Sequence, residues 1–370
     1  MSDVIVIGGG VIGLSIAYEL ARHDQRVKLL ERGELGREAS WAGAGILPPP
    51  ATRSDLPAWD RLQALSYELH GLWSEELLAL TGIHNGYRRC GGLYLARVAG
   101  EAAALRAAAE QWRSDGVKVE SPSPRELAEI EPGLAEMLAR DQIRAAYRLP
   151  DEAQIRNPRH LKALVAACRK VGVELVENTS VTHFDERAGR VTGVVTERGT
   201  ISAAAVCIAT GAWTDALAAQ LGLTLGVYPV RGQMLLYRCA APPLTHIVNE
   251  GPRYLVPRDD GHVLVGATEE DVGFDKRNTN VALAELREFA VSLVAALASA
   301  ELVASWAGLR PHAVDGFPYL GRVPHLENCF VAAGHYRAGI FTSPGTAVLM
   351  RELICGEPLA IDISEFRLDR

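Results

Sequence analysis

Residues 3–13 read DVIVIGGGVIG, and this stretch decides the fold of the first part of the chain. Val4 to Ile7 form a short apolar run of β-branched residues, which predicts a fully buried strand. A glycine-rich turn comes directly after this run, and residues 14–22 then place apolar side chains on one face of a helix. Strand, glycine turn and helix in this order are typical of the first unit of a dinucleotide-binding domain.

The glycines Gly8, Gly10 and Gly13 have the spacing GxGxxG, and each has a separate physical role. The first permits a tight turn, the second lets the backbone approach a pyrophosphate, and the third lets the helix pack closely on the strand. The helix N-terminus attracts the anion. A second strand over residues 27–30 ends in Glu31, 18 residues after Gly13, where a carboxylate can bind a ribose hydroxyl.

These features together predict a bound adenine dinucleotide rather than an ordinary glycine-rich turn. NAD and FAD both fit the stretch, whereas Glu31 would repel the 2′-phosphate of NADP. Residues 36–47 are rich in small side chains, which let a backbone lie close to a flat ligand and offer N–H groups to its oxygens. The alternative for this segment is a plain connecting loop.

The composition indicates a globular protein of two domains. The chain has 370 residues, 48% of them hydrophobic, and its net charge of −7 argues against a nucleic-acid partner. No apolar run approaches the ~18–20 residues of a membrane span. The first core strand begins so close to the N-terminus that we expect no signal peptide, and therefore a cytoplasmic protein with no membrane partner.

Cysteine spacing gives no sign of a metal site. The six cysteines form no C-x-x-C pair and no Cys/His group with the spacing of a zinc site. We expect free thiols in a reducing compartment, and no bound metal. The cysteines are Cys90, Cys168, Cys207, Cys239, Cys329 and Cys355.

Two later segments are also typical of a nucleotide-binding sheet. Residues 204–210 read as a buried strand that ends at Thr210 and Gly211, and residues 328–333 read as a strand that ends at Gly334. Ligands of open α/β sheets bind where such strands end. The sequence therefore places ligand contacts at both strand ends.

The stretches between these segments are sheet-forming and poorer in glycine. A hairpin is expected over residues 253–267, and helices are expected over residues 56–80, with Leu72 in a buried stripe, and after Asn157 as N-cap. The pattern predicts an α+β fold in which one domain is discontinuous. A dinucleotide-binding domain would cover residues 1–82, 143–222 and 306–370, and a substrate-binding domain residues 83–142 and 223–305.

Several blocks spread over nearly the whole chain resemble the glycine oxidases of the D-amino-acid oxidase superfamily. The resemblance is close to the member that supplies the glycine imine for the thiamin thiazole. The blocks are GGGVIG at 8–13, AGIL at 44–47, YLVPR at 254–258, VGAT at 265–268, GFD at 273–275, WAGLRP at 306–311, DGFPYLG at 315–321 and GHYRAGI at 334–340. This resemblance implies FAD as cofactor, a Rossmann-like FAD-binding domain of the glutathione-reductase type, and an antiparallel-sheet substrate domain.

The same resemblance implies which residues bind FAD. A helix N-terminus near the flavin ring would stabilise the negative charge of the reduced flavin. For His335 and Arg337, a structural hydrogen bond is an equal alternative to a direct role. The implied cofactor residues, added to Gly8, Gly10 and Gly13 and to Thr210 and Gly211 at the strand end, are Val11, Ile12, Glu31, Arg32, Ala39, Ser40, Ala44, Gly45, Ile46, Val181, His335, Tyr336, Arg337, Ala338, Gly339, Ile340 and Phe341.

Arg310 and Tyr254 match the substrate-binding and catalytic positions of the family. A guanidinium binds a carboxylate as a planar two-point fork, so Arg310 would hold the amino acid over the flavin. The tyrosine hydroxyl would meet the same carboxylate. The alternatives are an ion pair of Arg310 with Asp315 and a core role for Tyr254. Arg337 is expected at the substrate as well.

The chain departs from related patterns at two places. Sarcosine oxidases attach flavin through a cysteine just after the Arg-Pro stretch, and this chain has His312 and Ala313 there, so we expect non-covalent FAD. Glu269 stands where the glycine oxidase pattern has methionine. Glu269 is therefore a candidate for substrate selection, and the alternative is an outward side chain paired with a base such as Lys276.

The resemblance implies an oxidase of glycine, and of sarcosine or small D-amino acids as further candidates. Hydride transfer from Cα to flavin N5 would give an imine that hydrolyses to glyoxylate, and reoxidation by oxygen would give hydrogen peroxide. Orientation and electrostatics would suffice, without a protein acid or base. Other N-substituted glycines, a dehydrogenase that passes electrons to a partner, and an inactive flavin-binding module are the alternatives. The oligomeric state is left open.

Overall fold

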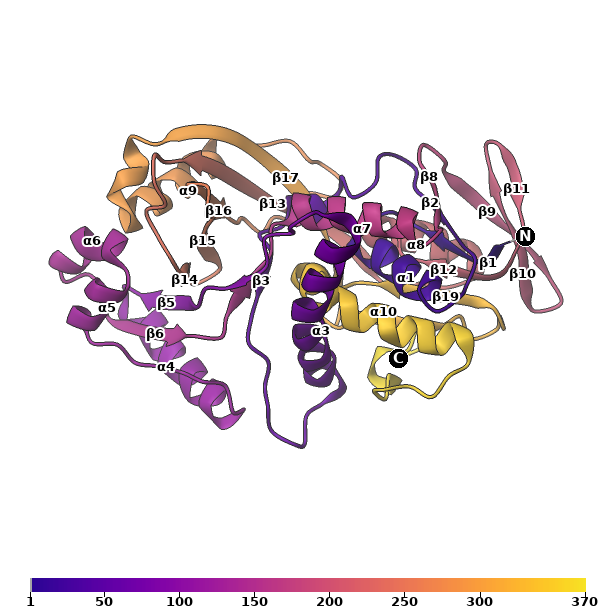
Figure 1. Cartoon of the computed structure of the whole chain (residues 1–370), viewed down its shortest axis with the longest axis horizontal. Coiled ribbons are helices and arrows are strands. Elements are labelled where there is room, and N and C mark those ends of the chain that lie inside the picture. Colours follow the sequence, from indigo (N-terminus) through magenta and orange to yellow (C-terminus); the bar gives the residue numbers. More distant parts are fainter. Residues whose placement is uncertain (1) are drawn as a thin grey trace.

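Two large sheets lie side by side along the long axis of the molecule (Figure 1). The structure, a computed structural model, describes residues 2–370. The first sheet has six strands, and each is parallel to its neighbours except β18. In spatial order they are β18 (Tyr319–Arg322), β19 (Cys329–Ala333), β12 (Ala203–Ile208), β1 (Ser2–Ile7), β2 (Val27–Leu30) and β8 (Glu174–Val176).

Side chains of β1 alternate between two hydrophobic cores on opposite faces of this sheet. Val4 and Val6 share a core with the helices α1 (Val11–Ala21), α3 (Ala58–Thr81), α7 (Asn157–Lys170) and α10 (Gly339–Cys355). Ile5 and Ile7 share the other core with a small antiparallel sheet of β9 (Val181–Arg187), β10 (Arg190–Thr196) and β11 (Gly199–Ile201). The prediction of a fully buried strand is confirmed, and burial on both faces explains why this run contains no polar residue.

The second sheet has seven strands and is antiparallel apart from the pair β5 and β14. In spatial order they are β17 (Glu301–Ala313), β13 (Val227–Arg238), β16 (His262–Gly266), β15 (Arg253–Pro257), β14 (Ile247–Glu250), β5 (Gly92–Ala96) and β6 (Ala145–Leu149). One face packs on the helices α5 (Pro124–Ile130), α6 (Ala135–Ala139) and α9 (Asn280–Leu293). The expected hairpin over residues 253–267 is confirmed as β15 and β16.

Strands β13 and β17 are long enough to reach both cores. They pair along their whole length, from Val227 opposite Ala313 to Arg238 opposite Glu301. Val227 and Ala313 are buried in the core beneath the first sheet, whereas Leu235 is buried in the core of the second. This pair of strands therefore fixes the two sheets relative to each other.

Shorter elements complete the connections between the sheets. A small sheet pairs β7 with β3 and β4, and so joins the segment after α2 to the segment before β5. These elements are α2 (Ala39–Ala42), β3 (Ile46–Leu47), β4 (Arg88–Arg89), α4 (Ala99–Ser114), β7 (Ala153–Gln154) and α8 (Thr214–Ala218).

The expected α+β class is confirmed, and the division into two domains stays a proposal. Two strands do not fit its boundaries. β6 pairs with β5 in the seven-stranded sheet, although the expected FAD-binding domain begins again at residue 143. β17 crosses the expected boundary between residues 305 and 306, because it pairs with β13 on both sides of that point.

Two local expectations are wrong. The helical stripe predicts a buried Leu72, but this side chain is 62% exposed, whereas Leu62 and Trp73 of the same predicted stripe are buried together with Leu77. Asn157 is the first residue of α7 rather than its N-cap. Its side chain amide instead donates to the Ser40 carbonyl at 2.8 Å, so a contact outside the helix decides its conformation.

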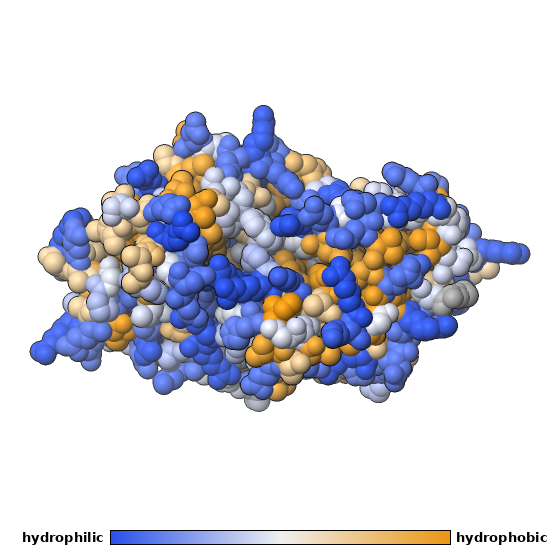
Figure 2. Space-filling view, turned by 45° about the horizontal axis from the view of Figure 1, so that its top comes forward, coloured by the Kyte–Doolittle hydropathy of each residue, from blue (hydrophilic) through white to orange (hydrophobic). Residues whose placement is uncertain are grey.

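The surface is mixed in character. Hydrophilic residues cover most of the face drawn in Figure 2, and patches of hydrophobic residues interrupt them. Exposed large apolar side chains include Phe274, Val281 and Val314. None of the helices within residues 2–370 combines the length and the apolar character needed to cross a membrane.

The contact between Gly13 and the glycine turn gives the first prediction. A β-carbon on Gly13 would overlap the Gly8 carbonyl oxygen, so Gly13→Ala should push α1 away from β1. Overpacking of this kind destabilises by about 1–3 kcal/mol, which a lower midpoint of thermal unfolding would show. Gly100→Ala in α4 is the matched control, because its added methyl meets open space, and it should leave the midpoint unchanged or slightly raised. Equal midpoints for the two variants would contradict the predicted overlap.

Candidate active site

A cavity of about 740 Å³ lies where the first sheet meets the second. Its wall combines the ends of β1, β2, β12 and β19 with the middle of β13 and β17. Every cofactor residue expected from the sequence lies on this wall except Gly13, which packs against Gly8 behind it. Those on the wall are Gly8, Gly10, Val11, Ile12, Glu31, Arg32, Ala39, Ser40, Ala44, Gly45, Ile46, Val181, Thr210, Gly211, His335, Tyr336, Arg337, Ala338, Gly339, Ile340 and Phe341.

Hydrogen bonds fix the backbone N–H groups of the glycine turn at one end of the cavity. Gly8 has φ +109°, a left-handed conformation that side chains rarely adopt. The Val11 N–H at the start of α1 donates to Ser40 Oγ at 2.9 Å. Glu31 accepts from the Gly9 N–H at 2.7 Å and from the Gly33 N–H at 2.8 Å, so its carboxylate is fixed beside the turn. A helix N-terminus and a fixed carboxylate together suit the pyrophosphate and ribose of a dinucleotide.

Three side chains from distant segments hold the loop over residues 39–46. Arg258 Nη2 donates to the Ala44 carbonyl at 2.7 Å, and Trp306 Nε1 donates to the Ala42 carbonyl at 3.1 Å. The third is the contact of Asn157 with Ser40 described above. Burial lowers the pKa of Arg258 to about 10, which still leaves it charged near neutral pH. These hydrogen bonds fix the conformation of the loop, so it forms part of the cavity wall and is more than a plain connection.

The far end of the cavity is formed by the segment before α10. Residues 334–341 line it and include the 3₁₀ helix η5 (Tyr336–Ala338), so the N-terminus of α10 lies at the cavity. The His335 side chain is buried and lies 3.1 Å from Thr346 Oγ1, and burial lowers its pKa to about 3. His335 is therefore a neutral ring bound to α10, in a residue that lines the cavity.

These observations show that the cavity fits FAD. It offers a fixed turn for the pyrophosphate, a carboxylate for the ribose, and a helix N-terminus at the opposite end. Within residues 2–370, none of the six cysteines lies on its wall, and all six are free thiols. Residues 312 and 313, where a covalent attachment would be expected, are His312 and Ala313.

Arg310 lies in the C-terminal part of β17, at the junction of the two sheets. Its guanidinium passes over β13 at Gly232, where a β-carbon would overlap it. Nη1 donates to the Thr268 carbonyl at 3.0 Å, and no carboxylate within residues 2–370 pairs with this guanidinium. The alternative of an ion pair with Asp315 is wrong, because Asp315 pairs with Arg370 at 2.6 Å. Arg310 thus presents a positive charge to the cavity without a protein counter-ion.

Tyr254 lies on β15, on the face of the sheet that is turned toward the cavity. It pairs with Gly266 on one side and Asn249 on the other. Its hydroxyl lies 3.6 Å from Met234 Sδ, which is a weak acceptor, so the hydroxyl can still serve a ligand. Burial raises the pKa of Tyr254 and the nearby Arg310 opposes this, so Tyr254 stays a neutral donor near physiological pH.

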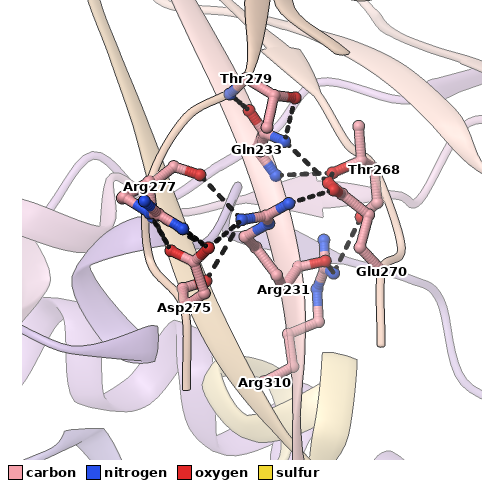
Figure 3. Close-up of polar contacts among 8 residues, drawn as sticks. All are labelled: Arg231, Gln233, Thr268, Glu270, Asp275, Arg277, Thr279 and Arg310. Atoms are coloured by element: carbon pink, nitrogen blue, oxygen red, sulfur yellow. Dashed lines mark hydrogen bonds and ion pairs between the residues drawn. The ribbon is translucent and has the colours of Figure 1, made fainter. Parts of the chain in front are cut away.

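A buried polar network supports the segment that holds Arg310 (Figure 3). Arg231 is almost fully buried and pairs with Glu270 at 2.5 Å, and its Nη1 donates to the Arg277 carbonyl at 2.9 Å. Thr268 Oγ1 donates to the same Glu270 carboxylate at 2.5 Å. The Arg231 ion pair therefore fixes the segment whose Thr268 carbonyl binds Arg310.

Gln233 closes the same network from β13. Its backbone N–H donates to Thr268 Oγ1 at 2.9 Å, and its side chain donates to Glu270 at 2.8 Å. The Thr279 N–H donates to Gln233 Oε1 at 2.7 Å, which ties in the start of α9. Residues 268–279 are thereby held against β13 from both ends (Figure 3).

Glu269 does not line the cavity within the part of the chain that the structure describes, contrary to the expected direct contact. Its carboxylate accepts from Arg337 Nη1 at 2.7 Å, and it is Arg337 that lies on the wall. The expected partner Lys276 pairs instead with Glu38 at 2.9 Å. Glu269 is therefore the counter-ion of a cavity arginine.

Sequence reasoning missed several residues of the wall. Tyr94, Met234, Asn249 and Gly232 line the cavity, and none of them belongs to a motif. Strand register brings them together, because Tyr94, Asn249 and Tyr254 occupy paired positions on three neighbouring strands. Side chains alternate between the two faces along β14 and β5, but which face meets the cavity follows only from the pairing of these strands.

Comparison with known proteins agrees with this geometry. The model of the family described as FAD dependent oxidoreductase matches residues 3–353. Glycine oxidase from Pseudomonas putida is 39% identical over 361 residues, which cover 97% of this chain and 96% of that protein. The crystal structure of glycine oxidase from Geobacillus kaustophilus superposes with a TM-score of 0.94 at 37% identity, covering 100% of this chain and 98% of that chain.

A further relative combines two activities in one polypeptide. The bifunctional protein ThiO/ThiG from Nostoc sp. is 34% identical over 372 residues, which cover 100% of this chain and 55% of that protein. The cavity, the fixed glycine turn and these similarities agree on one class of flavoenzyme. The chain belongs to the FAD-dependent oxidoreductase family, together with these glycine oxidases.

Proposed function

We propose that this flavoenzyme oxidises glycine, and small amines of the same type, at the Cα–N bond. The observation that carries the proposal is the Arg310 guanidinium, which lines the cavity and has no carboxylate partner within residues 2–370. A half-buried cation of this kind, without a protein carboxylate beside it, is stabilised when a ligand carboxylate binds it. The relatives named glycine oxidase support glycine as that ligand.

The residues of the cavity would orient the amino acid. Arg310 would bind the carboxylate, and the Tyr254 hydroxyl would donate a second hydrogen bond to it. The two contacts would fix the direction of the Cα–H bond, and the apolar surfaces of Met234 and Tyr254 on the wall would exclude water from the reacting carbon. When bound, FAD supplies the two-electron acceptor that the protein lacks.

We infer that molecular oxygen is the second substrate and hydrogen peroxide a product, with glyoxylate from hydrolysis of the imine. The decisive experiment is a peroxide assay of the FAD-loaded protein with glycine, sarcosine and D-alanine. Peroxide formation with one of them is the expected result. Turnover that needs an artificial electron acceptor would indicate a dehydrogenase, and no turnover with any acceptor would overturn the proposed activity.

Non-covalent FAD gives a prediction about the cofactor. No cysteine of the described chain reaches the cavity, so acid precipitation should release intact FAD into the supernatant. The measurement is the flavin absorbance of pellet and supernatant, followed by chromatography of the released flavin. Flavin that stays with the precipitated chain would contradict the non-covalent attachment.

The role of Arg310 gives a second prediction. A charge-assisted hydrogen bond is worth about 1.5–3 kcal/mol, so Arg310→Ala should raise KM for glycine roughly 10- to 150-fold while FAD stays bound. Gly232→Ala keeps Arg310 but displaces its guanidinium, because the added methyl overlaps it. This variant should therefore also raise KM. Arg238→Ala, an exposed arginine on β13 paired with Glu301, is the control. Wild-type kinetics in Arg310→Ala would show that Arg310 does not bind the substrate carboxylate.

We further propose that Glu269 acts on substrate choice through Arg337. Glu269→Met would leave Arg337 free to attract a second substrate carboxylate. The ratio of kcat/KM for D-aspartate over D-alanine should then rise by about threefold or more, which is only ~0.65 kcal/mol of differential binding. Asp271→Asn, an exposed neighbour, is the control. An unchanged ratio in Glu269→Met would show that Glu269 has no part in selection.

A further inference from the structure

A fully buried carboxyl group lies beside the cavity without a basic partner. Glu152 lies in the turn between β6 and β7, and its carboxyl accepts from the Tyr94 hydroxyl at 2.6 Å and from Asn249 Nδ2 at 3.3 Å. A β-carbon on Gly92 would overlap this carboxyl, so the glycine makes room for it. Among residues 2–370, no lysine, arginine or histidine forms an ion pair with Glu152.

The two partners of Glu152 connect it to the substrate end of the cavity. Tyr94 and Asn249 both lie on the cavity wall. Asn249 pairs with Tyr94 on one side and with Tyr254 on the other, so all three side chains are on one face of the sheet. Tyr254 in turn adjoins Arg310. Tyr94 therefore links the Glu152 carboxyl to the part of the cavity wall that also carries Tyr254 and Arg310.

The groups around this pair are mostly neutral. Trp112 of α4 packs on the Tyr94 ring at 4.8 Å, and the Cys90 thiol, whose pKa is raised by burial, lies on the segment before β5. The positive charge of Arg337 in η5 partly opposes the rise in the pKa of Tyr94 that burial and Glu152 cause. Burial raises the pKa of Glu152 to about 7, and it raises that of Tyr94 well above its usual value.

A glutamine at this position could accept from the Tyr94 hydroxyl through its carbonyl and donate to Asn249 Oδ1 once the Asn249 amide turns over, without the cost of burying an ionisable group. What the carboxyl adds is the capacity to bind a proton near neutral pH. A perturbed acid of this kind, placed next to a cavity, is typical of proton-transfer sites. The geometry thus points to a proton path from the cavity through a hydroxyl to a buried acid.

We propose that Tyr94 and Glu152 form a proton-accepting pair for the substrate amino group, an inference that rests on the proposed function. The substrate ammonium passes one proton to the Tyr94 oxygen, and the Tyr94 O–H passes its own proton to the Glu152 carboxylate. One N–H bond breaks, one O–H bond forms on the carboxyl, Tyr94 remains a neutral phenol, and no electrons move. The amine gains the lone pair that assists departure of the Cα hydrogen with its bonding electrons.

Tyr94 is the member of the pair that would touch the substrate, and Glu152 acts through it. Below the pKa of Glu152 the carboxyl is already protonated and cannot accept, so wild-type kcat/KM should fall on the acid side of that value. Above it the pair is fully competent. After product leaves, the proton on Glu152 returns to water through the same hydroxyl.

The test is the pH profile of kcat/KM for glycine in FAD-loaded Glu152→Gln. Near pH 7 the variant should be about 100-fold slower than wild type, in the range of general-base contributions. Near pH 10, where the amine is largely free of its proton, the difference should shrink to about threefold or less. Tyr94→Phe should show the same alkaline recovery, because it interrupts the same path. A purely structural loss would not recover at high pH.

A second readout does not depend on activity. Infrared difference spectra between about pH 5 and about pH 9 should contain a protonated-carboxyl band that disappears in Glu152→Gln. Glu129→Gln, which changes an exposed acid of α5 that contacts Arg125, is the matched control and should keep both the band and the pH profile. Bound FAD and an unchanged melting midpoint would verify folding of each variant.

The outcomes separate the two proposals. A Glu152→Gln pH profile parallel to that of an active wild type, or an infrared band unaffected by the variant, overturns the proton-accepting pair alone. A wild-type protein that oxidises no amino acid overturns the proposed function. Alkaline recovery together with loss of the band supports the pair.

Discussion

The pairing of β13 with β17 is the constraint on which the site depends. These strands reach from the core beneath the parallel sheet into the core of the antiparallel sheet, so one hydrogen-bonded ribbon sets the distance between the two. Arg310 lies on this ribbon, and its guanidinium needs the absence of a side chain at Gly232. A shift of one residue in register would turn Arg310 to the opposite face of the sheet.

The cavity is built by contacts between segments that are far apart in the chain. Arg258 and Trp306 come from the antiparallel sheet and hold the carbonyl groups of the 39–46 loop, which belongs to the cofactor end. The two ends of the cavity are thereby fixed to each other. A flavin and an amino acid react only when their reacting atoms are held about 3–3.5 Å apart and in line, which requires such a fixed frame.

Charged groups near the site fall into two groups. Arg231 is paired with Glu270 and surrounded by carbonyl acceptors, so its charge is compensated inside the protein. Breaking such a pair is expected to destabilise strongly, because it leaves one charge buried alone. Arg310 and Glu152 lack a partner of opposite charge among the described residues, and both adjoin the cavity. Their missing partners agree with roles in binding an anion and a proton.

The sequence by itself determined the cofactor end of this protein. The run from Val4 to Gly13, and Glu31 after it, act through backbone geometry and short-range contacts, so their spacing along the chain carries the information. The Arg310 and Tyr254 positions came from resemblance, and the structure brings both to the cavity wall, where their roles remain proposals. Leu72 lies on the apolar stripe of its helix and is nevertheless exposed. The spacing of apolar residues predicts the stripe, but it does not predict how much of the stripe a neighbouring element covers.

Only the tertiary structure decided which groups meet across strands and loops. The counter-ion of Glu269 is Arg337, 68 residues away, and the partners of Glu152 are Tyr94 and Asn249 on two other strands. Nothing local encodes these contacts, because the first joins the loop after β16 to η5 and the second follows from strand order and register in the antiparallel sheet. The cofactor end was readable because short-range geometry creates it, whereas the substrate end depends on long-range pairing that a linear pattern does not contain.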